Sequence, residues 1–417
     1  MGLDIKADVA ISGGGFAGLT LALALNRTLG PELGVVIVDR GSAPVPSSTG
    51  PDPRAVAISA TSRNLLEALG IWPALADVAE PVRRIEITDS GLDAGLRPVL
   101  LSWDNHIENP GSESATAAHI VPLPALTAAL ESAVAAQTSI RLLRPAHATG
   151  FEARAFDAQI ALGDGGVIAT RLAVAADGQR SVLREAAGIK SVGWPYAQVG
   201  IATTVAHTHD HGGIAVQHFL PAGPFAILPL RGKRSCVTWT ESEAEGRRIM
   251  ALDDEAFLAE LDLRFGGKLG ALQLAGGRQS WPLSLHLARA YIAPRLALIG
   301  DAAHGVHPIA GQGMNLAFRD VAALTEVIAD AARTGLDIGD ATMLERYERW
   351  RRFDSMTAAA GFDALNRLFS RDSRLLRSAR EVGLQVVDRL PALKRALIGE
   401  AAGTSGDLPK LLRGEIP

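Results

Sequence analysis

Asp8-Val9-Ala10-Ile11-Ser12-Gly13-Gly14-Gly15-Phe16-Ala17-Gly18 is the stretch that decides the fold of this chain. Its first five residues predict a short β-strand, the glycines predict a tight turn, and the mostly apolar residues 19–29 that follow predict a helix. A second apolar strand, Val35-Val36-Ile37-Val38, ends in Asp39. The order strand, turn, helix, strand predicts one βαβ unit of a parallel sheet.

The glycine turn has the spacing G-x-G-x-x-G. The first glycine permits a tight turn, the second lets a pyrophosphate approach the backbone, and the third lets helix and strand pack closely. The start of the helix favours the negative phosphates, and an acidic residue after the second strand binds ribose hydroxyls and repels a 2′-phosphate. The turn therefore predicts a dinucleotide site but does not distinguish FAD from NAD. The expected contacts are Gly13, Gly15, Phe16, Ala17, Gly18, Asp39 and Arg40.

The composition indicates a large protein without a nucleic-acid partner. The chain has 417 residues, 47% of them hydrophobic, and a formal net charge of −4. This predicts two closely joined domains with a sizeable core, and so balanced a charge provides no field that would attract nucleic acid. The single cysteine, Cys236, excludes an internal disulfide and a CxxC metal site.

The chain opens without a basic segment, an apolar segment and a cleavage site in succession, which argues against secretion. Apolar runs such as residues 19–25 are too short to cross a bilayer. We therefore expect a protein of the reducing cytoplasm.

Two further motifs follow apolar runs that predict strands. They are Asp177-Gly178-Gln179-Arg180-Ser181-Val182-Leu183-Arg184 and Gly300-Asp301-Ala302-Ala303-His304-Gly305-Val306-His307-Pro308-Ile309-Ala310-Gly311-Gln312-Gly313-Met314-Asn315. By itself, the first is equally a helix start that its aspartate and serine cap. Together they resemble the second and third fingerprints of the class A FAD-dependent aromatic hydroxylases, D-G-x-x-S-x-x-R and G-D-A-A-H-x-x-x-P-x-x-G-Q-G-x-N, which favours FAD.

The resemblance implies a role for each motif. In that family the second motif touches FAD and a reduced nicotinamide cofactor. The third binds the ribityl-phosphate side of FAD with its aspartate and wraps the isoalloxazine ring with its Pro-to-Asn part. An arginine matching Arg54 reaches the pyrophosphate, a contact that suits a guanidinium. The implied FAD contacts are Arg54, Asp177, Gly178, Ser181, Arg184, Gly300, Asp301, Pro308, Gly311, Gln312, Gly313, Met314 and Asn315.

A helix that opens near residues 313–315 suits reduced flavin, which is an anion with its charge near N1 and the C2 carbonyl. Free N–H groups at the helix start face that charge, and glycines permit a close approach. Because the flavin carries the chemistry, no catalytic residue or general base is assigned. The residues expected to shape the flavin site are Pro308, Gly311, Gln312 and Gly313.

His304 and His307 are three residues apart, but no carboxylate or cysteine joins them at ligand spacing. We expect them to shape the loop and expect no metal site.

Other segments are similar to the ubiquinone-biosynthesis branch of that family, the UbiH/UbiF/UbiI type. They include Leu69-Gly70-Ile71-Trp72, Trp194-Pro195-Tyr196-Ala197-Gln198 and the closing residues 406–414. One departure is Val121-Pro122-Leu123-Pro124-Ala125, where the family usually has polar residues near the flavin. The polar contact that the family makes there is in doubt.

The resemblance implies a monooxygenase that hydroxylates an aromatic ring with O2 through a flavin C4a-hydroperoxide, after NADH or NADPH has reduced the FAD. The implied substrate is a polyprenyl-phenol intermediate of ubiquinone biosynthesis, and proteins of that pathway are the implied partners. No second G-x-G-x-x-G follows a strand, so we expect the nicotinamide cofactor to bind transiently, although a dedicated reductant protein stays open. Two alternatives also stay open: a class A hydroxylase of a soluble aromatic acid, and a non-catalytic flavin-binding subunit of a biosynthetic complex.

Residues 198–240 alternate β-branched and polar residues between turns, which predicts an antiparallel sheet. We expect part of this sheet to form the wall of the substrate pocket over the flavin, although Phe225 and Ile227 equally suit an ordinary sheet core. The expected wall residues are His218, Phe225, Ile227 and Pro229.

The C-terminal arm is basic and amphipathic. From Arg367 to Arg413 it has ten basic and five acidic residues, a net charge of +5. Such a helix either lies on an anionic membrane or packs on the FAD domain with a solvated arginine face. Because a polyprenyl substrate resides in the bilayer, we expect peripheral contact with the inner membrane.

The expected fold is α/β: a Rossmann-like FAD/NAD(P)-binding domain with an inserted mixed or antiparallel β-sheet substrate domain and a C-terminal helical tail. The FAD-binding domain is expected from residues 1–75, 98–186 and 280–335. The substrate domain is expected from 76–97 and 187–279, and the helical tail from 336–417.

Overall fold

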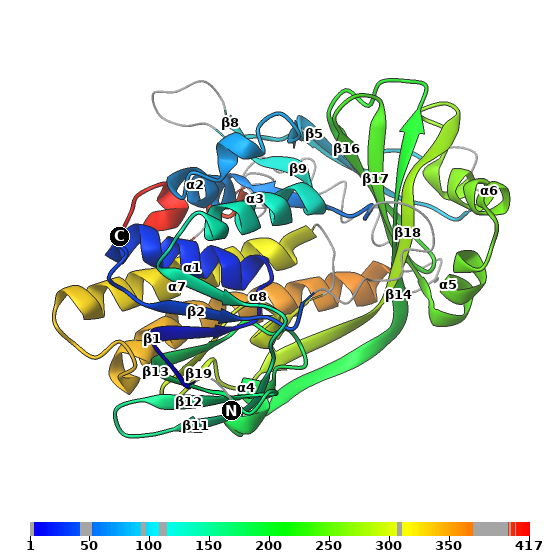
Figure 1. The fold of residues 1–417 in the computed structure, drawn as a ribbon. Helices are drawn as coiled ribbons and strands as arrows, with labels where there is room; N and C mark the ends of the chain where they lie inside the picture. The colour runs from blue at the N-terminus through cyan, green and yellow to red at the C-terminus, as the bar shows by residue number, and fades with distance from the viewer. Residues whose placement is uncertain are drawn as a thin grey trace.

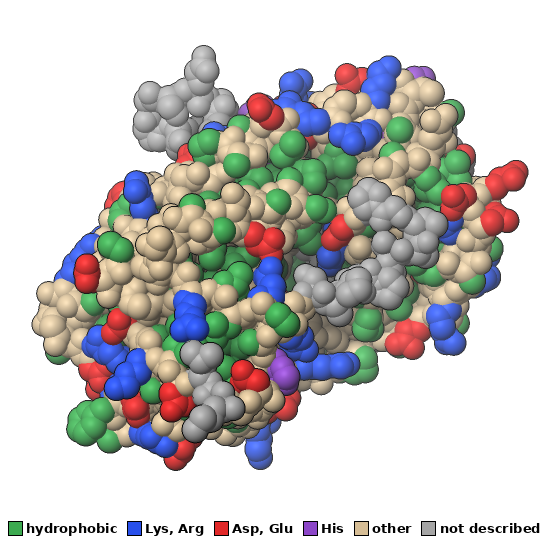
Figure 2. Space-filling model, viewed as in Figure 1, with side chains coloured by type: hydrophobic (Ala, Val, Ile, Leu, Met, Phe, Trp, Pro, Cys, Tyr) green, Lys and Arg blue, Asp and Glu red, His purple; other side chains and the backbone are tan. Residues whose placement is uncertain are grey.

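Two large sheets divide the molecule (Figure 1). The computed structural model describes residues 4–41, 52–92, 97–107, 115–306, 311–369, 399, 402–404 and 406–417. On the face shown in Figure 2, basic and acidic side chains are interspersed, in keeping with the small net charge of −4.

The first sheet contains the predicted βαβ unit. Its order is β10-β2-β1-β13-β12-β11, and β20 also pairs with β13. Five of its strands run parallel, whereas β11, β12 and β19 are antiparallel to their neighbours. The strands are β1 (Asp4–Ser12), β2 (Val35–Val38), β10 (Ile140–Leu143), β11 (Ala148–Ala153), β12 (Ala158–Leu162), β13 (Val167–Ala175), β19 (Ile292–Ala293) and β20 (Leu296–Leu298).

Three helices pack together on this sheet: α1 (Phe16–Leu29), α3 (Leu123–Ala135) and α7 (Gln312–Arg333) (Figure 1). The ring of Phe16 meets that of Phe318 edge-on, with their centroids 6.0 Å apart. β2 is buried along its whole length, as a continuous apolar run in a parallel sheet requires. The short helix α4 (Val182–Ala186) follows β13.

The second sheet has the order β21-β18-β14-β17-β16-β15-β5-β6 and is mostly antiparallel. The exception is β15, which pairs parallel with β5. The strands are β5 (Arg84–Asp89), β6 (Leu101–Asp104), β14 (Ser191–His207), β15 (Ile214–Leu220), β16 (Gly223–Leu230), β17 (Arg234–Ser242), β18 (Leu272–Ala288) and β21 (His304–Gly305).

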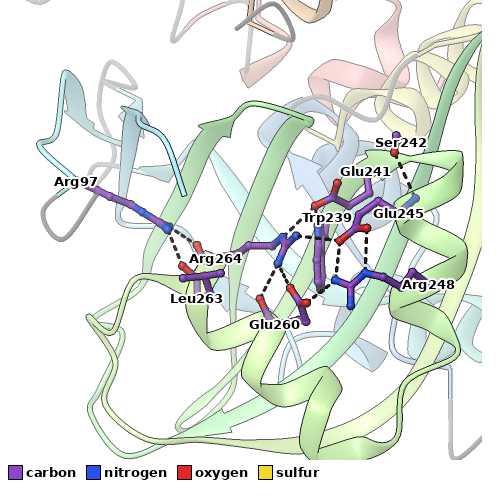
Figure 3. Close-up of polar contacts among 9 residues, drawn as sticks. All are labelled: Arg97, Trp239, Glu241, Ser242, Glu245, Arg248, Glu260, Leu263 and Arg264. Carbon is purple, nitrogen blue, oxygen red and sulfur yellow. Dashed lines mark hydrogen bonds and ion pairs between the residues drawn. The ribbon is translucent and has the colours of Figure 1, made fainter. Parts of the chain in front are cut away.

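Helices α5 (Glu243–Met250) and α6 (Asp254–Phe265) cover one face of the second sheet. An ionic network joins them to β17 (Figure 3). Arg264 of α6, which is 3% exposed, contacts the buried Glu241 at 2.9 Å and Glu260 at 2.6 Å, and its guanidinium lies over the Trp239 ring. Arg97 donates to the carbonyl oxygens of the last turn of α6.

The opposite face of the second sheet packs on a small sheet of order β3-β9-β4. This sheet connects the two halves, and β3 leads into α2. The elements are β3 (Ala55–Ser59), α2 (Ala60–Ala68), η1 (Trp72–Ala74), β4 (Glu80–Pro81) and β9 (Ala118–Pro122), with a two-stranded sheet of β7 (His106–Ile107) and β8 (Ala115–Thr116) beyond it.

The C-terminal end returns to the first half of the molecule. Helix α8 (Ala341–Phe369) packs on α7, and η4 (Lys410–Arg413) lies against α2 and α7. The backbone N–H of Lys410 donates to Glu326 at 2.8 Å, and Asn64 donates to the Leu412 carbonyl at 3.1 Å. Most of the predicted amphipathic arm, residues 370–398, lies outside the described residues.

The predicted fold class is confirmed: an α/β half with the predicted βαβ unit carries a second half built on a mixed, mostly antiparallel sheet. One boundary differs from the expectation. The sequence predicts residues 98–186 in the nucleotide-binding half, but β6 pairs with β5 in the second sheet, from Arg84–Asp104 to Ile87–Leu101. The third motif is also tied to both halves, since its β21 pairs with β18.

Candidate dinucleotide-binding site

A cavity of about 280 Å³ opens where β1, β2 and β13 end. The carboxyl ends of parallel strands are the usual place for a ligand in such sheets. The cavity brings together the first turn, Asp39 and the start of the second motif, which are far apart in the sequence. Its lining residues are Ser12, Gly13, Gly14, Gly15, Val38, Asp39, Arg40, Ala146, His147, Ala148, Ala176, Asp177, Gly178 and Val182.

The first turn depends on four glycines. Gly13 has φ +113°, and a Cβ there would overlap the backbone carbonyl of Ala176. A Cβ at Gly18 would overlap the Gly13 carbonyl, so this glycine provides the close packing of helix on strand. Gly15, the N-cap of α1, faces open space: beyond its chain neighbours, no atom would lie within 4 Å of an added Cβ, so its backbone is open to a ligand. At Gly14, which the spacing pattern leaves free, a Cβ would lie 2.8 Å from Asp39.

Asp39 lies at the end of β2, but it has a protein partner that the sequence did not indicate. Arg144 contacts its Oδ2 through Nε at 2.7 Å and through Nη2 at 2.5 Å. The other end of the guanidinium contacts Glu131 of α3 at 2.6 Å. Arg144 follows β10, so this ion-pair network joins α3 to the edge of the cavity.

The second motif caps a helix in the way that one of its two interpretations predicted. Ser181 is the N-cap of α4 and accepts from the Arg184 N–H, while Asp177 Oδ2 accepts from the Val182 N–H at 3.0 Å. Asp177 Oδ1 is buried and has no hydrogen-bond partner among the described residues. Asp177 and Gly178 line the cavity, whereas Ser181 is fully buried.

Arg184 holds the second and third motifs together. It is 3% exposed and donates to the carbonyl oxygens of Gln179 at 2.8 Å and Ala302 at 3.1 Å. Burial lowers the pKa of this guanidinium, with Glu185 and Asp177 opposing the shift. Its Nη1 is 2.8 Å from His286 Nε2, and burial followed by the charge of Arg184 lowers the pKa of His286 to about 4. Arg184 therefore shapes the site from within the protein.

A buried network anchors the third motif. Asp320 of α7 accepts from the Gly300 N–H at 2.9 Å, contacts His304 Nε2 at 2.6 Å and pairs with Arg351 of α8 at 2.8 Å. Burial opposes its charge, but His304 and Arg351 hold the pKa of Asp320 below its usual value. His304 thus shapes the loop, and among the described residues no cluster of three metal ligands occurs. His307 lies outside the described residues.

Helix α7 begins at the end of the third motif, as its sequence predicted. Gly311 is the N-cap with φ +63°, a left-handed conformation that favours glycine. Asn315 accepts from the Ser59 N–H at 3.1 Å and donates to the Ala57 carbonyl at 2.9 Å, so it fixes the helix start against β3. Gln312, Gly313 and Met314 form the first turn of α7, and Pro308 lies outside the described residues.

Two other expected contacts, Asp301 and Arg54, are not among the residues that line the cavity. Asp301 is exposed and has no hydrogen bond or ion pair within the described part of the chain; the protein around it nevertheless removes solvation and raises its pKa. Arg54 forms a bidentate contact with Asp52 at 2.7 and 3.0 Å, so its guanidinium already has a carboxylate partner. Burial opposes the charge of Asp52, but Arg54 holds the pKa of this carboxyl below its usual value.

The four expected wall residues lie on the face of the second sheet that α5 and α6 cover, and not on the face that packs on the small sheet. Phe225 and Ile227 pack in the cluster under α5 and α6, and the His218 ring stacks on Phe225 at 6.2 Å. Burial lowers the pKa of His218 to about 4. Side chains alternate between the two faces of a strand, and Pro229 follows Ile227 by two residues on β16, so it points to the same face. The expectation is therefore corrected: Leu228 packs instead in the cluster that β3 and β9 share, and the alternation of the strand puts Ala226 on the same side.

The residues present fit a dinucleotide. The open backbone at Gly15 and the N-terminus of α1 suit a pyrophosphate, and the free Oδ1 of Asp39 suits a ribose hydroxyl. A volume of about 280 Å³ suits the adenosine-diphosphate half of FAD rather than the whole molecule.

A family model and the curated relatives agree on one family. A family model described as "FAD binding domain" matches residues 6–359. The chain is 40% identical to "Ubiquinone hydroxylase UbiL" of Rhodospirillum rubrum, over 99% of this chain and 94% of that protein. It is 33% identical to "3-demethoxyubiquinol 3-hydroxylase" of Escherichia coli (95% and 98%) and 30% identical to "Ubiquinone biosynthesis monooxygenase COQ6, mitochondrial" of Homo sapiens (96% and 93%).

Solved structures share the fold at lower identity. p-Nitrophenol 4-monooxygenase PnpA from Pseudomonas putida superposes with a TM-score of 0.76 at 16% identity, covering 96% of this chain and 98% of that one. Klebsiella pneumoniae HpxO, complexed with FAD and uric acid, superposes with a TM-score of 0.70 at 18% identity, covering 96% of each chain. These likenesses concern the arrangement of the two halves.

Proposed function

The chain belongs to the family of FAD-dependent hydroxylases that includes the enzymes of ubiquinone biosynthesis, and from this premise we propose that it hydroxylates the aromatic ring of a polyprenyl-phenol intermediate of that pathway. Its cofactor is FAD and its reaction is that of a monooxygenase. The proposal extends this activity to the substrate and to the residues that bind it.

The observation that carries the proposal is the near full-length match to three hydroxylases or monooxygenases with ubiquinone or a ubiquinol in their names. The matches cover both halves of the molecule and not only the nucleotide-binding half. They also favour a hydroxylase of a polyprenyl-phenol over a hydroxylase of a soluble aromatic acid or a flavin-binding subunit without turnover.

FAD, when bound, supplies the redox chemistry, with NADH or NADPH as the proposed electron donor and O2 as the proposed oxygen source. The protein supplies binding and orientation. The backbone of Gly13–Gly15 and the N-terminus of α1 would hold the pyrophosphate, and Asp39 would hold the adenosine ribose. Asp301, an exposed carboxylate without a described partner, would accept hydrogen bonds from the ribityl side. The first N–H groups of α7 would face the pyrimidine edge of the flavin.

We place the substrate ring against the face of β16 that is turned toward β3 and β9. Leu228 lies on this face and packs against the same buried cluster as the small side chains of Ala55 and Ala57. Ala226, two residues before Leu228 on the strand, points to the same side. Ala57 in turn lies close to Gly311, where an added Cβ would be 3.3 Å from the Ala57 Cβ. This position joins the expected flavin site to an apolar surface, which suits a prenylated phenol and excludes water.

Contact with pathway proteins and with the inner membrane is a further part of the proposal. Its support is the net charge of +5 between Arg367 and Arg413. In the described part of the chain, no helix is both long and apolar enough to cross a membrane.

The test combines a deletion strain with the purified protein. The strain is expected to accumulate a prenylated phenol that lacks one ring hydroxyl, and this intermediate names the substrate and the position. The purified protein is expected to be yellow and to oxidise NAD(P)H faster when that phenol is added, with one hydroxylated product per turnover. Bound FAD without turnover would favour the scaffold subunit, stimulation only by a soluble aromatic acid would favour the alternative hydroxylase, and a colourless protein that takes up no FAD would refute the proposal.

A further inference from the structure

Arg144 lies between two acidic side chains at the adenosine end of the cavity, the part that Val38–Arg40 and Ala146–Ala148 line. Its Nε and Nη2 both contact Asp39 Oδ2, at 2.7 and 2.5 Å, and its Nη1 contacts Glu131 at 2.6 Å. Nη2 is also 3.5 Å from the Gly14 carbonyl. The guanidinium therefore touches the glycine turn and the ribose-binding carboxylate at once.

The contacts leave one oxygen of Asp39 available. Both nitrogens of Arg144 engage Oδ2, and Oδ1 has no hydrogen-bond partner in the part of the chain that the structure describes. The side chains of Asp39 and Arg144 are 16% and 29% exposed, respectively, so solvent screens this pair less than it screens a surface ion pair. The hydrogen bond from Nε and the ion-pair contact of Nη2, both to the same oxygen, restrict rotation of the carboxylate, which would otherwise turn freely on its single bond.

We propose that Arg144 is a positioning residue for the cofactor: it holds Oδ2 of Asp39 so that Oδ1 accepts a hydrogen bond from the 2′-hydroxyl of the adenosine ribose. This inference rests on the proposed binding of the FAD adenosine at this cavity. Arg144 acts through Asp39 and need not touch the cofactor. It also balances the charge of a carboxylate that lies near the site of two phosphates.

Glu131 holds the end of the Arg144 guanidinium that points away from Asp39. Its hydrogen bond, together with the charge of Asp39, raises the pKa of Arg144 despite partial burial, so the guanidinium stays charged. With Nε, Nη1 and Nη2 all engaged by carboxylates, Arg144 is not free to bind a 2′-phosphate. The site therefore selects an adenosine whose 2′-hydroxyl is unmodified.

The test compares ligands that differ only at the 2′ position. The full-length apoprotein is titrated with ADP and 2′-deoxy-ADP by calorimetry. Binding of FAD and FMN is measured by flavin fluorescence. The wild-type protein is expected to bind 2′-deoxy-ADP about tenfold more weakly than ADP. In Arg144→Met this ratio is expected to fall below about threefold, as in Asp39→Ala, with FAD binding weakened about tenfold and FMN binding unchanged. Glu131→Gln, the matched control, retains an acceptor for Arg144 and is expected to keep the wild-type ratio.

Several outcomes would overturn the inference. They are a wild-type protein that binds both nucleotides equally, an Arg144→Met protein that keeps the full ratio, and an Arg144→Met protein that loses FAD and FMN affinity alike, which indicates general loosening. If Arg144→Met does not fold, Arg144→Lys is used: it keeps the charge but offers one nitrogen, and a ratio between those of wild type and Asp39→Ala is expected. An unchanged ratio in that variant would also refute the inference. Failure of the wild-type protein to bind FAD would instead refute the proposed function.

Discussion

Replacing Arg264 by Met is expected to loosen α6 from the second sheet. The Arg264 guanidinium contacts Glu241 Oε1 at 2.9 Å and lies 4.6 Å from the centroid of the Trp239 ring (Figure 3). Both charged side chains are almost fully buried, at 4% and 7% exposure. Met fills much of the same space, but it leaves the Glu241 carboxylate with the Trp239 N–H, at 2.9 Å, as its remaining side-chain donor among the described residues.

The expected magnitude follows from the burial of this pair. Removing one partner of a buried ion pair costs about 3–5 kcal/mol, because the other charge is left in a poorly solvating environment. The more exposed Glu260 and Glu245 add little, since solvent screens them. Arg264→Met combined with Glu241→Leu removes both charges and is expected to recover most of the loss.

The assay is native-state hydrogen exchange of the α6 amides, which measures the opening of this segment directly. A loss of about 3–5 kcal/mol corresponds to roughly 10²- to 10⁴-fold faster exchange. Arg248→Met is the matched control: Arg248 contacts Glu245 and Glu260 but is 47% exposed, so α6 protection is expected to change little. The reasoning is refuted if Arg264→Met exchanges no faster than Arg248→Met, or if the double variant is less protected than Arg264→Met.

Three other outcomes are expected. Because burial lowers the pKa of His218 to about 4, below about 6.5 in an unfolded chain, the stability linked to its neutral form is complete above pH 6.5 and is lost as the pH falls toward 4; thermal melts of His218→Gln should show a flatter decline over that range. Gly14→Ala is expected to lower FAD affinity by at least tenfold in fluorescence titrations, since its Cβ would lie 2.8 Å from Asp39, whereas Gly361→Ala, in an open position of α8, should leave it unchanged. Asn315→Leu removes both hydrogen bonds from α7 to β3, and a loss of about 1–3 kcal/mol should appear as a lower melting temperature with faster FAD release.

The nucleotide-binding half could be predicted because its decisive features are local. The turn from Gly13 to Gly18 needs a left-handed or closely packed backbone at defined positions, and these requirements select glycine. The start of α7 at Gly311 is specified in the same way, by a residue with φ +63°. Such constraints act within a few residues and are visible in one sequence.

The contacts that support the site could not be predicted, because they join residues far apart in the chain. Arg144 and Asp39 are separated by 105 positions, and no local pattern pairs them. The second motif also shows that a match to a family fingerprint does not by itself say what each residue does. Ser181 is buried as a helix cap, and Arg184 holds two loops together from within the protein.

The substrate wall shows a limit of a different kind. Alternation along β16 predicts two faces, but it does not say which face meets α6 and which meets β3. For Phe225 and Ile227 the sequence left two interpretations open, a wall over the flavin and an ordinary sheet core, and they form the core under α5 and α6. Leu228 and, by the alternation of the strand, the small Ala226 remain on the face that must leave room for a ligand.

β14 and β18 are each 17 residues long and pair over most of their length, from the base of the first half to the far end of the second (Figure 1). A hinge that opened the two halves like a clamshell would have to bend or break this shared ladder. Its register is interrupted between Pro195 and Val199 and between Thr203 and Val205, so any flexing would be confined to those two places. Substrate entry and product exit in this architecture would then depend on movements of loops and of the cofactor over a stationary frame.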